Sequence, residues 1–139
     1  MITPTLIVLL GFISWTLVLL ILMEVIRSKL VFTKEVAATG FDQENSTLSP
    51  FMQRLARVLA NCIEGLVLFG SLMVFAIITD NSDITNGLAY AFLIARLIQS
   101  TIHLISISAT AITLRFTAFS VQMIIAAYWA YSLWMQLFL

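Results

Sequence analysis

The sequence predicts an all-α integral membrane protein that folds as a single four-helix bundle. Of its 139 residues, 61% are hydrophobic and only 10% are charged, and the mean hydropathy is +1.05. A soluble domain of this size could not cover so much apolar surface, whereas stretches of about 20 apolar residues can cross the roughly 30 Å hydrocarbon layer of a bilayer. The net charge is zero, which gives no reason to expect a nucleic-acid partner.

Four helices are predicted, at about residues 5–26, 50–79, 85–107 and 114–138, with one long polar loop at about 27–49. Ser49 and Pro50 suit a helix start, because serine caps the first turn and proline is tolerated within it. Polar residues 80–83 form a tight turn, and a Ser/Thr/Ala-rich segment at 108–113 joins the last two helices. We find no internal repeat and no second domain, so residues 1–139 are expected to form one membrane domain.

Basic residues predict the orientation of the bundle in the membrane. The first loop and its flanks carry Arg27, Lys29, Lys34, Arg54 and Arg57. The turn at 80–83 carries none, and cytoplasmic loops are enriched in lysine and arginine. We therefore expect a cytoplasmic first loop, with both termini on the non-cytoplasmic side. Tyr90, Trp129 and Trp134 then fall towards the outer end, as in an aromatic belt.

A polar stripe runs along the second helix into its apolar part. Arg54, Arg57, Asn61 and Glu64 lie at i, i+3, i+7 and i+10, which places them on one helical face. Charged groups inside a membrane span are costly and normally face a protein interior or a water-filled cavity. This stripe is therefore the first candidate for a functional site.

The third helix repeats the pattern with Arg96, Gln99 and His103 at i, i+3 and i+7. Glu64 and Arg96 lie deepest, and each is the obvious ionic partner of the other. We favour an ion pair that fixes helix packing for these two residues. For His103, a neutral hydrogen-bonded histidine and a ligand contact both stay open. A metal site is not expected, because the chain offers no second ligand.

Three arginines near the predicted cytoplasmic boundary, Arg54, Arg57 and Arg115, outnumber the buried anions. Snorkelling to lipid headgroups is one explanation for Arg54, and for Arg27 at the end of the first helix, and a role in binding an anion stays open for both. It is less natural for Arg57, which shares its face with Asn61 and Glu64. The alternative is an anion pocket, because guanidinium groups bind carboxylates through paired hydrogen bonds. The residues alone predict a site for a small polar anion.

The two motifs together resemble the MAPEG family, the membrane-associated proteins in eicosanoid and glutathione metabolism. They read Arg54-x-x-Arg57-x-x-x-Asn61-x-x-Glu64 and Arg96-x-x-Gln99-x-x-x-His103. The four spans and Arg115 near the start of the last helix add to the likeness. The resemblance implies a homotrimer of four-helix subunits, with glutathione bound between neighbouring subunits near the cytoplasmic face. By position it implies these cofactor-binding residues: Arg27, Arg57, Asn61, Glu64, Arg96, Gln99 and His103. It implies that Arg115 stabilises the glutathione thiolate.

The implied activity is that of a glutathione transferase or peroxidase acting on lipophilic electrophiles or lipid hydroperoxides. The sequence departs from the family pattern at Leu59, where many members have histidine, and at His103, where animal members usually have tyrosine. Phe116 and Phe119 replace a serine and a tyrosine near the helix-four arginine. These departures keep open a non-catalytic alternative, a lipid-binding scaffold or accessory membrane subunit. The compact chain favours a bacterial plasma membrane.

Overall fold

The computed structural model describes residues 1–139 and contains only helices and their connections. The elements are α1 (Pro4–Phe32), α2 (Pro50–Gly65), the π-helical segment η1 (Leu66–Gly70), α3 (Ser71–Ile78), α4 (Ser82–Ile105) and α5 (Ala109–Phe138). Because α2, η1 and α3 follow one another without a break, they form one span, Pro50–Ile78, and the chain has four helices long and apolar enough to cross a membrane. The predicted all-α, four-helix fold class is confirmed.

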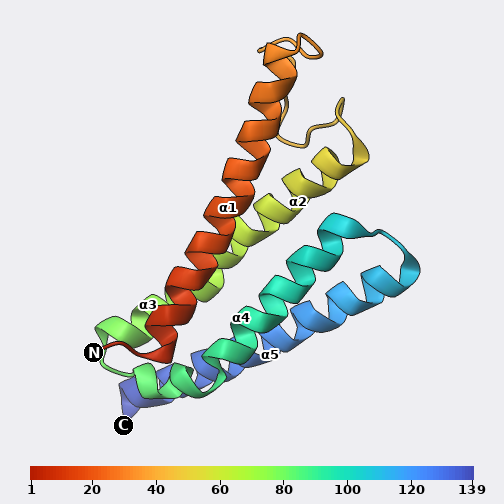
Figure 1. Ribbon diagram of the computed structural model, residues 1–139. Coiled ribbons are helices and arrows are strands. Elements are labelled where there is room, and N and C mark those ends of the chain that lie inside the picture. Colours follow the sequence, from red (N-terminus) through yellow and green to blue (C-terminus); the bar gives the residue numbers. More distant parts are fainter.

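The four spans run up and down, so that both termini and the turn at Asp80 lie at one end of the bundle (Figure 1). The long loop before α2 and the short connection between α4 and α5 lie at the other, which we call the loop end. Helix α1 packs on α2 and α4, while α5 packs mainly on α4 and, to a smaller extent, on α3. Contact between α5 and α2 is at most marginal.

Three helices extend beyond their predicted limits, and α4 does so by beginning at Ser82 rather than near residue 85, within the predicted turn. α1 continues to Phe32, past the charged residues that suggested an end near residue 26, because a helix can leave the membrane without stopping. α5 begins at Ala109 rather than near residue 114, because the Ser108 hydroxyl caps it by accepting a hydrogen bond from the Ala111 N–H at 3.2 Å. The Thr113 hydroxyl bonds back to the Ala109 carbonyl at 3.0 Å. The Ser/Thr-rich joint is therefore mostly helix.

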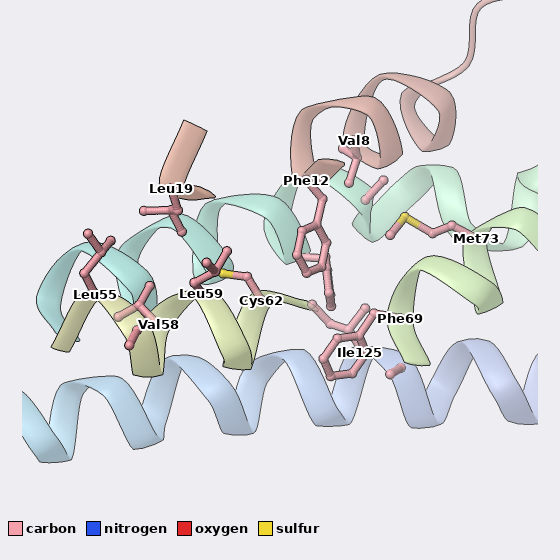
Figure 2. Close-up of a cluster of buried hydrophobic side chains, with 14 of the residues drawn as sticks. Val8, Phe12, Leu19, Leu55, Val58, Leu59, Cys62, Phe69, Met73 and Ile125 are labelled. Atoms are coloured by element: carbon pink, nitrogen blue, oxygen red, sulfur yellow. The ribbon is translucent and has the colours of Figure 1, made fainter. Parts of the chain in front are cut away.

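Buried apolar side chains from α1, α2, η1, α3, α4 and α5 meet along the centre of the bundle (Figure 2). An aromatic group forms its middle: the ring centroids of Phe69 and Phe92 are 5.0 Å apart, and those of Phe92 and Trp129 are 5.5 Å apart. Such tilted pairs suit the charge distribution of aromatic rings. The prediction that Trp129 joins an outer aromatic belt was wrong, since it is 0% exposed. Tyr90 and Trp134 are exposed.

The π-helical segment follows directly on the polar stripe of α2. Such wide turns are rare and occur often beside functional sites. Gly65, immediately before it, lies so close to α1 and α4 that a Cβ atom there would approach the Arg96 Nη2 atom to 2.8 Å and the Phe12 ring to 3.1 Å. The bare backbone of Gly65 therefore provides the space in which the Arg96 side chain lies.

Candidate functional site

Most of the predicted polar site residues line two adjoining hollows between α2, α4 and α5. The first has a volume of about 280 Å³, and its polar lining residues are Asn61, Gln99, His103 and Arg115. The second, of about 160 Å³, is lined by Asn61, Glu64 and Arg96 among others. Asn61 and Phe119 border both hollows. Six of the eight predicted site residues thus lie around one continuous region.

The first hollow lies where α5 stands away from α2. α2 contributes Asn61, α4 contributes Gln99 and His103 from successive turns of one face, and α5 contributes Arg115 with Phe116 and Phe119. Arg115 and His103 are both half-buried, and neither forms a hydrogen bond or ion pair within the chain. His103 therefore has no hydrogen-bond partner within the single chain, and its role as a ligand contact stays a prediction. Both side chains remain available to a ligand.

Arg96 is buried in the core, with only 1% of its surface exposed. Its Nη1 atom donates to Asn61 Oδ1 at 2.5 Å, while its Nε and Nη2 atoms have no hydrogen-bond partner. The guanidinium lies 5.2 Å from the ring centre of Phe12 and 5.6 Å from that of Phe69. Cation–π attraction to these rings, together with the Asn61 amide, holds the buried charge.

The expected ion pair between Glu64 and Arg96 does not form, and this prediction was wrong. The chain's ion pair is instead between Arg27 and Glu24, at 3.5 Å. Asn61 lies one helical turn before Glu64 and accepts from Arg96, while the Glu64 side chain is exposed on the outside of the bundle. Helical spacing predicted that the stripes carrying Glu64 and Arg96 face each other. In the folded chain, however, Asn61 and not Glu64 is the residue that contacts Arg96. Both residues line the 160 Å³ hollow.

A chain of amide groups connects Arg96 to α5. Gln99 Nε2 donates to Asn61 Oδ1 at 3.5 Å, and Gln122 Nε2 donates to Gln99 Oε1 at 2.8 Å and to the Ala118 carbonyl at 3.1 Å. Gln122 is fully buried and was missed by the sequence analysis. The sequence did contain a signal for Gln122. An amide inside an apolar span needs a hydrogen-bond partner, and Gln122 lies seven residues after Arg115 on the same helical face.

Two of the cationic residues in the polar stripe of α2, Arg54 and Arg57, line neither hollow. Arg54 donates from Nε to the Leu104 carbonyl at 2.8 Å and so ties α2 to the last turn of α4. This bond corrects the interpretation of Arg54 as a residue that only reaches for lipid headgroups. Arg57 is exposed and lines neither hollow.

Arg27 lies outside both hollows and anchors the long loop. Its Nε and Nη2 atoms donate to Asn45 Oδ1 at 3.1 and 2.5 Å, and Nη2 also donates to the Asp42 carbonyl at 2.9 Å. Its guanidinium lies 5.4 Å from the ring centre of Phe41. Asn45 is 1% exposed and donates in turn to the Met52 carbonyl at 2.8 Å. Within one chain, Arg27 therefore contacts the loop and not the other predicted site residues.

The first hollow has a positive character. Arg115 is its charged lining residue, and no aspartate or glutamate lines it. In the second hollow a buried guanidinium and an exposed carboxylate, those of Arg96 and Glu64, face a shared space. Poorly solvated hollows of one sign concentrate ions of the opposite sign. The arrangement suits a ligand that has anionic or carbonyl groups at one end and a cationic group at the other.

Four apolar spans with charged and amide side chains gathered between them define an integral, multi-pass membrane protein with an internal polar site. The model of the MAPEG family matches residues 5–135. The chain therefore belongs to the MAPEG family. No curated protein and no solved structure matches it.

Proposed function

We propose that this protein is a glutathione-dependent membrane transferase or peroxidase that acts on lipophilic electrophiles or lipid hydroperoxides. The observation that supports the proposal is the gathering of six predicted site residues, from α2, α4 and α5, around the two adjoining hollows. MAPEG family membership supports it as well. The proposed setting is a bacterial plasma membrane, with the loop end cytoplasmic and both termini on the other side.

The chemistry of the side chains fits glutathione, which carries two carboxylates, one ammonium group, two peptide amides and a thiol. Arg115 and the Asn61 amide can donate to carboxylate or carbonyl oxygens, and Glu64 can accept from an ammonium group. Pockets for small molecules usually measure about 300–1,000 Å³. Together the hollows of 280 and 160 Å³ fall within this range, but Glu64, which lines the second, is exposed, so one subunit would supply only part of the wall. We propose that neighbouring copies in a homotrimer complete the site, with the exposed Arg57 and the loop-bound Arg27 approaching it from the other side.

Bound glutathione would supply a thiol as the nucleophile or reductant. A free thiol has a pKa of about 8.5, so the reactive thiolate is scarce at neutral pH unless a nearby cation favours it. Arg115 meets this need, because it is half-buried beside the first hollow and has no partner in the chain. Ile112 and Phe116 place exposed apolar surface beside it. We assign these two residues the role of admitting a second, apolar substrate from the bilayer.

A second candidate function is a non-catalytic lipid-binding scaffold or accessory subunit. One observation favours it: Arg96, Asn61, Gln99 and Gln122 are already linked to one another by hydrogen bonds within the chain. In that case the polar stripes serve to hold α2, α4 and α5 together. The two functions differ in the role of Arg115, because only the enzyme needs this residue to stabilise a thiolate.

The deciding experiment is an ultraviolet thiolate difference spectrum of the detergent-purified protein on addition of glutathione. We expect a saturable thiolate band in the wild type, no band in Arg115→Ala, and an unchanged band in Lys29→Ala, which removes an exposed cation at the end of α1. Equal bands in all three proteins would assign the thiolate to another residue. The absence of both the band and saturable binding in the wild type would overturn the enzyme proposal and favour the scaffold.

A further inference from the structure

We infer that Gln122 is a positioning residue that gives the first hollow a fixed hydrogen-bonding polarity. Acting through Gln99, and together with Arg96, it turns the N–H groups of Gln99 and Asn61 towards the hollow and their oxygens away from it. The side of the hollow formed by Asn61 and Gln99 then favours a group that accepts hydrogen bonds, such as a carboxylate, a thiolate or a peptide carbonyl. The identity of the ligand rests on the proposed function, whereas the polarity rests on the chain's own contacts.

The polarity is set at one end by Arg96. A guanidinium can only donate hydrogen bonds, so the Asn61 atom that lies 2.5 Å from Arg96 Nη1 must be the oxygen. The amide nitrogen of Asn61 then points away from Arg96. It forms no hydrogen bond within the chain, and Asn61 borders both hollows. Two N–H groups of Asn61 are therefore free for a ligand.

The polarity is set at the other end by the backbone of α5. The Ala118 carbonyl can only accept, so the Gln122 atom that lies 3.1 Å from it must be the nitrogen Nε2. The same nitrogen has a second proton, which it donates to Gln99 Oε1 at 2.8 Å. With its oxygen engaged, Gln99 directs Nε2 towards Asn61 Oδ1 at 3.5 Å. The assignments from the two ends agree, since reversing any one amide would set two donors or two acceptors against each other.

The consequence is a wall of donors. Asn61 Nδ2, Gln99 Nε2 and the Arg115 guanidinium are donor groups of residues that line the first hollow, His103 adds a ring that can donate at one nitrogen and accept at the other, and no carboxylate lines it. Gln122 itself is 0% exposed and does not border the hollow, so it acts only through Gln99. Its own oxygen is buried without a donor. An unpaired buried amide oxygen is unfavourable, and an apolar residue would avoid it. Orienting Gln99 accounts for a glutamine at this position.

The first test needs no ligand. Protein labelled with ¹⁵N in its glutamine and asparagine side chains is compared in detergent micelles as wild type, Gln122→Met and Gln136→Met. Gln136 is an exposed glutamine on the same helix and serves as the matched control. We expect Gln122→Met to shift the side-chain amide signals of Gln99 and Asn61 and to speed their hydrogen exchange, while the control changes neither. Unchanged Gln99 and Asn61 signals in Gln122→Met would overturn the inference.

The second test measures binding of reduced glutathione by calorimetry. We expect Gln122→Met to weaken binding about tenfold, the effect of roughly one hydrogen bond, and Gln136→Met to leave it unchanged. We expect this loss of affinity in a Gln122→Met protein that still folds, as its melting temperature in detergent will show. A wild-type affinity in folded Gln122→Met would assign Gln122 a purely structural role. A wild type that binds no glutathione would overturn the proposed function, while the amide signals still decide the polarity.

Discussion

Arg96 shows how this protein keeps a cation inside a membrane span without a carboxylate partner. Its guanidinium lies between the rings of Phe12 and Phe69 and donates to Asn61. Removing a charge from water is costly, and one amide and two ring faces compensate only part of that cost. Close packing against the Gly65 backbone is the remaining feature that confines the group.

Replacing Gly65 with alanine tests this confinement. The new Cβ would approach Arg96 Nη2 to 2.8 Å and Phe12 to 3.1 Å, so the Phe12 ring would be crowded and the guanidinium would have to shift towards the 160 Å³ hollow that it lines. We expect a loss of about 1–3 kcal/mol in stability, the usual cost of overpacking a core, measured as a lower melting temperature in detergent. Gly87→Ala is the matched control, because nothing lies within 4 Å of the added atom. It should be neutral or stabilising, since alanine favours helix. Equal melting temperatures for Gly65→Ala and wild type would refute the account.

At the scale of elements, the long loop between α1 and α2 is held by Arg27 and Asn45. Asn45 adopts a left-handed backbone conformation with φ of 54°, which asparagine tolerates better than most residues. Nearby, Ser46 donates from its backbone N–H and its hydroxyl to the Asp42 carboxylate, and these bonds lower the pKa of Asp42 below its ordinary value of 3.8. The loop is therefore an ordered unit fastened to the end of α1.

If the hydrogen bonds between Arg27 and Asn45 hold the long loop, removing either side chain should loosen the loop to a similar extent. We expect Arg27→Ala and Asn45→Ala to speed trypsin cleavage at Lys34 several-fold, because local opening exposes the chain. Gln43→Ala, an exposed residue of the same loop, should cleave like the wild type. Gel analysis of cleavage over time gives the rates. If Arg27 also contacts glutathione in the assembled protein, Arg27→Ala alone will lose more affinity than Asn45→Ala. Unchanged cleavage in both variants would show that these bonds do not hold the loop.

At the scale of the whole molecule, the single subunit leaves a charged group uncovered within a membrane span. Glu64 belongs to the span Pro50–Ile78, yet its side chain is exposed on the surface of the bundle. A carboxylate at such a depth normally faces protein or water rather than lipid. A neighbouring copy of the chain can cover it, in agreement with the proposed homotrimer.

Native mass spectrometry tests the assembly directly. We expect a complex with three times the 15.5 kDa mass of the chain, released intact from mild detergent. Glu64→Leu should change the proportion of trimer, because the side chain would lie at the contact between copies, whereas Ile98→Leu, at an exposed apolar position of α4, should not. A protein that appears only as single chains at micromolar concentration would contradict the expectation, and the outward Glu64 would then need another partner.

Helical periodicity accounts for what could be predicted about the site. Apolar length identified the four spans, and the spacing of Asn61 with Glu64 and of Gln99 with His103 placed each pair on one helical face, as the two hollows show. Arg115 was assigned by resemblance, and it lines the first hollow. Arg27 and Arg57 lie outside both hollows, so their proposed cofactor role depends on contacts between subunits.

The sequence by itself determined the membrane class, the number of spans and the faces on which the polar residues lie, because these follow from local length and from rotation of about 100° per residue along a helix. Only the tertiary structure decided that Arg96 bonds Asn61 and not Glu64, that Trp129 is buried, and that Gln122 joins the polar network. These outcomes depend on how each helix is rotated against its neighbours and on how far each side chain reaches. Periodicity within a single helix contains neither quantity.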